Sequence, residues 1–267
     1  MLTQPSFYAA AVPAVILLGL SKGGFAGLGV LGMPVMALTI PPVQAAAITL
    51  PILMVQDVVS VWAYRHCWDR TNLKILLPGA VAGIVAAYLL ASRVPDAAVA
   101  LVLGVISIVF GLRRFLARRV DAQPVPAAAL NRPAGWFWGA VAGFTSMIAH
   151  AGGPPFQIYV IPQRLPRDLF VGTGVVFFAL VNLIKVPPYM AMGQLTRDNL
   201  ATSAVLFPLA VASTWAGVWL VRRVSGERFY DIVYVLLLLL GGKLTWDGAG
   251  WLLGQVCDPG AWWCVLA

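Results

Sequence analysis

The chain has 267 residues, of which 60% are hydrophobic and only 10% are charged, and its mean hydropathy is +0.86. A soluble domain carries roughly 25% charged residues, so this composition excludes a soluble globular protein and indicates an all-α polytopic membrane protein. The net charge of +8 comes from basic residues between apolar segments, where membrane topology places them, and we expect no nucleic-acid partner. The three cysteines form no CxxC pattern, so neither a metal site nor another cofactor is expected.

Apolar segments follow one another along the chain, and we expect helices at 6–20, 30–41, 43–64, 73–92, 97–116, 134–148, 155–162, 169–192, 198–221 and 229–247. The segments 6–20 and 134–148 are short, because a helix of about 15 residues rises only about 22 Å against a hydrocarbon core of about 30 Å. Each runs into a break rich in glycine and then into a second short apolar piece. This pattern predicts two broken-helix hairpins, at 6–41 and 134–162.

The two halves of the chain repeat one another around the long polar connector 117–133. The first repeat covers residues 1–116 and the second covers 134–247, and a Trp-rich tail follows at 248–267. Equivalent residues keep their order, at offsets that drift from 124 to 130: Gly19 with Gly143, Gly29 with Gly153, Pro78 with Pro208, and Gly111 with Gly241. Each repeat is then a hairpin followed by three transmembrane helices. Broken helices at matching positions of a duplication indicate the binding site of a secondary transporter.

The distribution of lysines and arginines among the loops distinguishes two possible topologies. If each hairpin is re-entrant and leaves the membrane on the side it entered, one face receives 13 basic loop residues and the other receives only Arg93 and Arg197. If each hairpin instead adds a crossing, one face receives 9 of these basic residues and the other receives 6. The positive-inside rule favours the first division. It predicts inverted repeats, a cytoplasmic connector and two periplasmic termini. In an oxidising periplasm Cys257 and Cys264 could form a disulfide, or they could remain free thiols.

The first break, SKGGFAGLGVLGMP at 21–34, has the composition of an anion site. Glycine permits unwound backbone, and the amide groups at the start of a half-helix lack intrahelical partners and carry a positive dipole. An anion satisfies both. Lys22 adds a charge that costs at least about 2.5 kcal/mol inside a membrane, so it needs a partner or a task. The candidate substrate-binding residues here are Ser21, Lys22, Gly23, Gly24, Gly27 and Gly29.

The second break, MIAHAGGPPFQIY at 147–159, supplies the other half of the predicted site. Its candidates are Ser146, His150, Ala151, Gly152, Gly153 and Gln157. His150 is either a structural group with satisfied hydrogen bonds, a donor to the anion or a proton carrier. The glycine pairs Gly79–Gly83 and Gly139–Gly143 have GxxxG spacing, and we expect them only to allow close helix packing.

Polar residues also occur inside two predicted spans. Asn182 and Lys185 lie three apart on one helical face, and both are further candidates for substrate binding. Asp57 lies in the span 43–64. It could form an interior ion pair with Lys185. If it is unpaired, it is, with His150, a candidate for proton coupling.

The stretch GLSKGGFAGLGVLGMP, answered after the connector by GFTSMIAHAGGPP, resembles the sulfite exporter TauE/SafE family, also called the toluene-sulfonate uptake permease family. The resemblance extends from about Val12 to Trp246. It implies a protein of the bacterial inner membrane that moves a small sulfur oxyanion, such as sulfite or an organosulfonate. We therefore expect a secondary transporter, and by the family's name an exporter, whose repeats rock around a midplane site. We expect no enzyme. An anion channel is the alternative, and the sequence leaves a homodimer open.

Overall fold

The computed structural model describes residues 5–25, 28–91 and 129–221, with scattered residues between 97 and 112, residue 223 and scattered residues between 238 and 250. Its elements are α1 (Pro5–Lys22), α2 (Gly29–Met36), α3 (Pro42–Tyr64), α4 (Arg70–Ala91), α6 (Arg132–Ala149), α7 (Gly153–Val160), the 3-10 helix η1 (Ile161–Gln163), α8 (Arg167–Ala191), α9 (Arg197–Val205) and α10 (Phe207–Val221). The regular structure of these ranges is thus helical, as predicted. Four of the helices are long and apolar enough to cross a membrane, or up to five spans if the bent pair α9–α10 counts as one.

The segment expected as one helix at 198–221 is two helices, α9 and α10, bent by 47°. Pro208 lies in the first turn of α10. Because proline has no backbone N–H and clashes with the preceding turn, it favours a helix start over a continuous helix. The predicted helices 97–116 and 229–247 lie largely outside the described residues, as do the connector up to residue 128 and the tail with Cys257 and Cys264.

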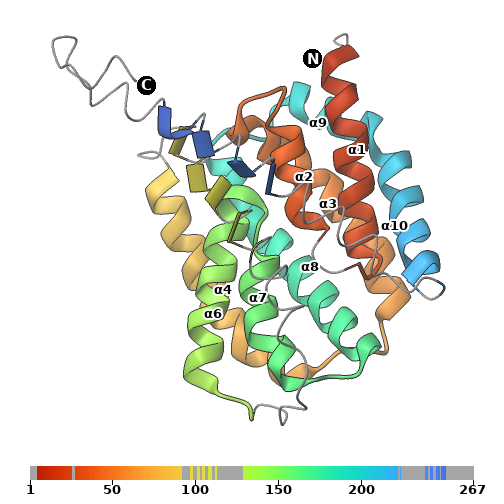
Figure 1. Cartoon of the computed structure of the whole chain (residues 1–267), viewed down its shortest axis with the longest axis vertical. Coiled ribbons are helices and arrows are strands. Elements are labelled where there is room, and N and C mark those ends of the chain that lie inside the picture. The colour runs from red at the N-terminus through yellow and green to blue at the C-terminus, as the bar shows by residue number, and fades with distance from the viewer. Residues whose placement is uncertain are drawn as a thin grey trace, which may run out of the picture.

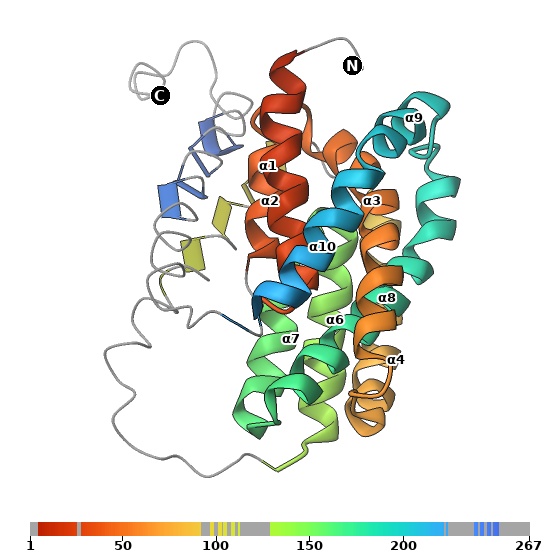
Figure 2. The ribbon, with the colours of Figure 1, turned by 90° about the vertical axis from the view of Figure 1, so that its right-hand side faces the viewer.

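The two hairpins approach the middle of the molecule from opposite ends (Figures 1 and 2). Helix α1 starts at the end where the N-terminus lies and runs inward, and α2 returns toward that end. Helix α6 starts at the other end and also runs inward, and α7 returns. The breaks between α1 and α2 and between α6 and α7 therefore both lie in the interior of the helical bundle.

Glycines let α4 and α6 pack with their backbones in contact. A Cβ added at Gly79 or Gly83 would come within 3.0 Å of a carbonyl oxygen of α6, and one at Gly139 or Gly143 would come equally close to a carbonyl oxygen of α4. Contacts this short leave no room for a side chain. The predicted packing role of both GxxxG pairs is confirmed.

Helices α1 and α10 pack in the same way. A Cβ at Gly19 would clash with Ser213, and a Cβ at Gly23 would clash with the backbone of Gly217. The first helix of each hairpin thus packs against a helix from the other half of the chain, α1 on α10 and α6 on α4. In both pairs residue numbers rise together along the contact, so the paired helices run parallel.

Two side-chain pairs are among the further interactions that join the halves. The side-chain amides of Asn72 and Gln163 exchange hydrogen bonds of 2.9 and 3.0 Å. Gln44 donates to Asn199 at 3.5 Å. In each case an asparagine in the first turn of a helix meets a glutamine that follows the hairpin of the other half.

Candidate functional site

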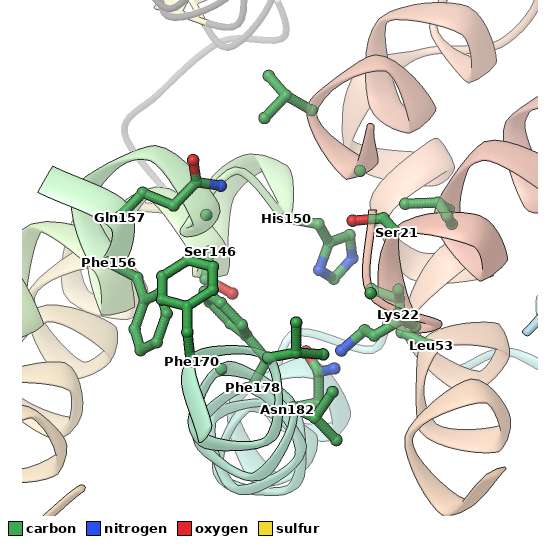
Figure 3. A pocket seen from close by; sticks show the side chains of 18 residues that line it. Ser21, Lys22, Leu53, Ser146, His150, Phe156, Gln157, Phe170, Phe178 and Asn182 are labelled. Atoms are coloured by element: carbon green, nitrogen blue, oxygen red, sulfur yellow. The ribbon is translucent and has the colours of Figure 1, made fainter. Parts of the chain in front are cut away.

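A cavity of about 110 Å³ lies between the two breaks. A single buried water needs only about 10–15 Å³, so the cavity has room for a solute larger than one water molecule. Figure 3 shows Ser21 and Lys22 on one side and Phe156 and Gln157 on the other. Nine of the predicted site residues line it: Ser21, Lys22, Gly24, Gly29, Ser146, His150, Gly153, Gln157 and Asn182.

The first break follows from the conformation of Gly24. Its φ of 128° lies where residues with a side chain are strained, so α1 ends at Lys22. The hydroxyl of Tyr64 on α3 donates to the Gly23 carbonyl at 2.8 Å and fixes the chain as it leaves the helix. Helix α2 begins at Gly29, beside the cavity. The helix end that was predicted as one half of the site therefore does face the cavity.

The second break has a different chemistry. His150 ends α6 in the left-handed conformation, with φ of 50°, and the Ala151 amide donates to the Thr145 carbonyl at 3.2 Å. Helix α7 begins at Gly153 and has Pro154 and Pro155 in its first turn. Prolines are favoured there because a first-turn N–H has no intrahelical acceptor. They also remove two amide donors, so this helix start offers an anion fewer hydrogen bonds than α2 does.

Lys22, which lines the cavity, and Asp57, which does not, form a largely buried ion pair, with side-chain exposures of 13% and 6%. The other carboxylate oxygen of Asp57 accepts a 2.6 Å hydrogen bond from Asn182. Of the two alternatives left open for Asp57, the ion pair with Lys185 does not form, because Lys22 and Asn182 contact its two oxygens. Asp57 is therefore not the unpaired carboxylate that proton coupling through it requires.

Lys185 is completely buried and is bonded only to neutral groups in the hydrogen bonds described. Its Nζ donates to the backbone oxygen and to the hydroxyl of Ser146, both at 3.1 Å, and lies 2.7 Å from Nδ1 of His150. Nε2 of His150 lies 2.9 Å from the carbonyl oxygen of Ala46, which can only accept. These contacts assign the proton to Nε2, so Nδ1 accepts from Lys185 and the imidazole is neutral.

The apolar side chains that line the cavity were not predicted from the sequence. They include Phe156 of α7 and Phe170 and Phe178 of α8, with Leu18, Val30, Leu53, Val171 and Val175. The sequence does contain a signal, since Phe170, Gly174, Phe178 and Asn182 are spaced four apart and so share one helical face. Polar and apolar side chains are therefore mixed around the cavity: Nζ of Lys22 lies 5.6 Å from the centroid of the Phe178 ring, and Gln157 lies on the same side as Phe156 (Figure 3).

Four predicted residues lie outside the lining. Gly23 packs on α10, and Gly152 packs against the Ala142 carbonyl and the ring of Phe178. Ala151 is buried, and Lys185 lies behind Ser146 and His150. Gly27 is outside the described residues. Among the residues that the structure describes, no three His, Cys, Asp or Glu side chains come together to hold a metal ion.

Comparison with known proteins gives one match. The family model described as Sulfite exporter TauE/SafE matches residues 11–244, which include both breaks and the residues that line the cavity. Searches of curated proteins and of solved structures found no match.

Proposed function

The chain belongs to the sulfite exporter TauE/SafE family, and from this membership and the cavity we propose that it moves sulfite or a small organosulfonate across the bacterial inner membrane. Membership implies a multi-pass membrane transporter of sulfur-containing anions. The proposal adds that the anion binds in the cavity between α1–α2 and α6–α7, in the middle of the bilayer.

The charge of the lining is the observation that carries this proposal. No carboxylate is among the described residues that line the cavity. The nearby carboxylate of Asp57 is already engaged by Lys22 and Asn182. The polar lining residues Ser21, Lys22, Ser146, Gln157 and Asn182 carry hydrogen-bond donors suited to oxyanions, whereas both ring nitrogens of His150 are already engaged. The oxyanion group would bind beside Lys22, and an organic substituent would lie against Phe156 and Phe170.

Several contacts support an inverted-repeat architecture with alternating access. The hydroxyl of Tyr64 donates to Gly23 and that of Tyr189 donates to Met147, and these partners are related by shifts of 125 and 124 residues, close to the offset of the glycines. The exchange of helices between halves, α1 on α10 and α6 on α4, has the same symmetry. Under this proposal the halves rock around the cavity, the connector 117–133 is cytoplasmic and both termini are periplasmic.

Flux measurements in proteoliposomes containing the purified full chain test the proposal. We expect saturable uptake of radiolabelled sulfite or methanesulfonate and counterflow against internal anion. Flux that rises without saturation and shows no counterflow would instead favour a channel. Absence of flux for every sulfur anion tried would refute transport by this chain.

A pair of variants tests the site itself. Lys22→Ala should abolish the flux, but it leaves Asp57 buried without its partner, which destabilises the fold. The double variant Lys22→Ala/Asp57→Asn removes both charges and should regain thermal stability without regaining flux. Lys74→Ala, at an exposed lysine near the start of α4, is the matched control and should transport normally. Wild-type flux in the double variant would remove Lys22 from the site.

A further inference from the structure

The position of Lys185 suggests how the transport cycle is coupled. Building on the proposed anion site, we infer that Lys185 takes up one proton when the anion enters the cavity and releases it when the anion leaves. Anion and proton would then cross the membrane together. Neither Asp57 nor His150 would carry the proton.

The surroundings of Lys185 disfavour a permanent ammonium. Its side chain is fully buried, and its hydrogen-bond partners are two oxygens of Ser146 and the neutral ring of His150. A buried charge without a partner of opposite sign is costly. The nearest carboxylate, Asp57, is bonded to Lys22 and Asn182. The charged form of Lys185 therefore needs another counter-charge.

The same partners accommodate both protonation states of the amine. An ammonium has three N–H donors, and three acceptors face it: the Ser146 carbonyl, the Ser146 hydroxyl and Nδ1 of His150. A neutral amine has two donors and one lone pair. It keeps the carbonyl and Nδ1 as acceptors, and the Ser146 hydroxyl, which can donate as well as accept, rotates to donate to the lone pair. Neither state leaves a buried polar group unsatisfied, so the site can titrate without unfolding.

The anion would supply the missing counter-charge. Ser146 and His150 both line the cavity and both contact Nζ of Lys185, so a bound anion lies one side chain away from the amine. An anion there stabilises the ammonium, and by linkage the ammonium strengthens anion binding to the same degree. The balance is one proton added to the amine per anion bound and one returned on release.

The other titratable groups near Lys185 do not replace it in this role. Both nitrogens of His150 are engaged, and a proton on Nδ1 would place an imidazolium against the lysine. Lys22 on α1 and Asp57 on α3 neutralise each other. Tyr189, one turn further along α8, donates its hydroxyl to the Met147 carbonyl. Helix α4, which also packs on α8, carries the exposed Arg70 and Lys74 and the half-buried Tyr88.

Proton uptake on binding tests the inference. Purified protein in weakly buffered detergent solution with a pH indicator is mixed with methanesulfonate, whose own charge is constant near neutral pH. The wild type should take up about one proton per anion bound, and its affinity should fall as pH rises, by up to about tenfold per unit. Lys185→Gln removes the titrating group and Lys185→Arg fixes the charge. Both should bind with no proton uptake, and the affinity of Lys185→Arg should not change with pH. Lys74→Gln is the control with normal uptake.

The results separate this inference from the proposed function. Wild-type proton uptake in Lys185→Arg, or anion binding by the wild type without proton uptake, overturns the role of Lys185 and leaves the anion site standing. If Lys185→Gln does not fold, Lys185→Arg alone decides. If the wild type binds neither sulfite nor methanesulfonate, the anion site fails and the coupling falls with it.

Discussion

The ammonium of Lys22, at the end of α1, and the carboxylate of Asp57, in α3, form an ion pair beside the cavity. This contact holds the first break against α3, the helix that follows the first hairpin. It also means that an anion near Lys22 meets a cation that already has a partner. Substrate binding there has to share the ammonium with Asp57 or displace it.

A double-mutant cycle should show that Lys22 and Asp57 are strongly coupled. Lys22→Ala or Asp57→Ala alone should lower the free energy of unfolding by about 3–5 kcal/mol, because each leaves the other charge buried and unpaired. The free energy of unfolding of the double variant should fall by much less than the sum of the two single-variant losses. Thermal unfolding in detergent measures all four proteins. Additive losses would mean that the two charges do not interact in the folded protein.

Gly83→Ala should destabilise the protein by disrupting the contact between α4 and α6. The added methyl group would lie within 3.0 Å of the Ala140 carbonyl oxygen. The atoms that the methyl group meets are backbone atoms of α6, so relief requires the helices to separate, at a cost of about 1–3 kcal/mol or more. A lower unfolding temperature is expected. An unchanged one would show that the two helices are not in the close contact described.

Gly153→Ala should keep the fold and change the transport. The added methyl group would meet only Nε2 of Gln157, at 4.0 Å, so the unfolding temperature should match the wild type. Because Gly153 lines the cavity, the methyl group narrows it. An extra methylene in a pocket costs up to about 1–3 kcal/mol, so flux of a bulky arylsulfonate should fall roughly tenfold or more, and sulfite flux should fall less. Equal losses for both anions would argue against a size effect.

Tyr189→Phe should weaken the second break. The variant leaves the Met147 carbonyl without the 2.9 Å hydrogen bond from Tyr189, and an unsatisfied buried acceptor costs about 1–3 kcal/mol. The corresponding Tyr64→Phe, which frees the Gly23 carbonyl, should cost a similar amount if the halves are equivalent. Denaturation of the two variants beside Tyr88→Phe gives the comparison. A loss of stability in only one of these two variants would argue against equivalent roles of the tyrosines in the two halves.

The sequence predicted the helices and breaks well because hydrophobic runs and glycines are local signals. The start of α3 at Pro42 and the break after Lys22 follow directly from proline and glycine chemistry. The cavity residues of the breaks could also be found, since an intramembrane lysine and a histidine beside glycines are uncommon.

Partnerships across the fold could not be found in this way. Whether Asp57 meets Lys22 or Lys185 depends on how α1, α3 and α8 turn about their axes, and no local pattern fixes that rotation. The aromatic lining of the cavity was missed for a related reason. Phe170 and Phe178 look like ordinary core residues until the packing shows which face of α8 borders the cavity.

The exchange of helices between the halves also has a consequence for biogenesis. During synthesis α1 enters the membrane long before α10 has been translated, so the face of α1 with Gly19 and Gly23 lacks its packing partner through most of translation. Helix α6, by contrast, is inserted after α4 and can pack on it at once. The N-terminal hairpin should therefore reach its final packing late in synthesis. In a ribosome-bound chain that stops before α10, proteases that do not cleave the complete protein should cleave that hairpin.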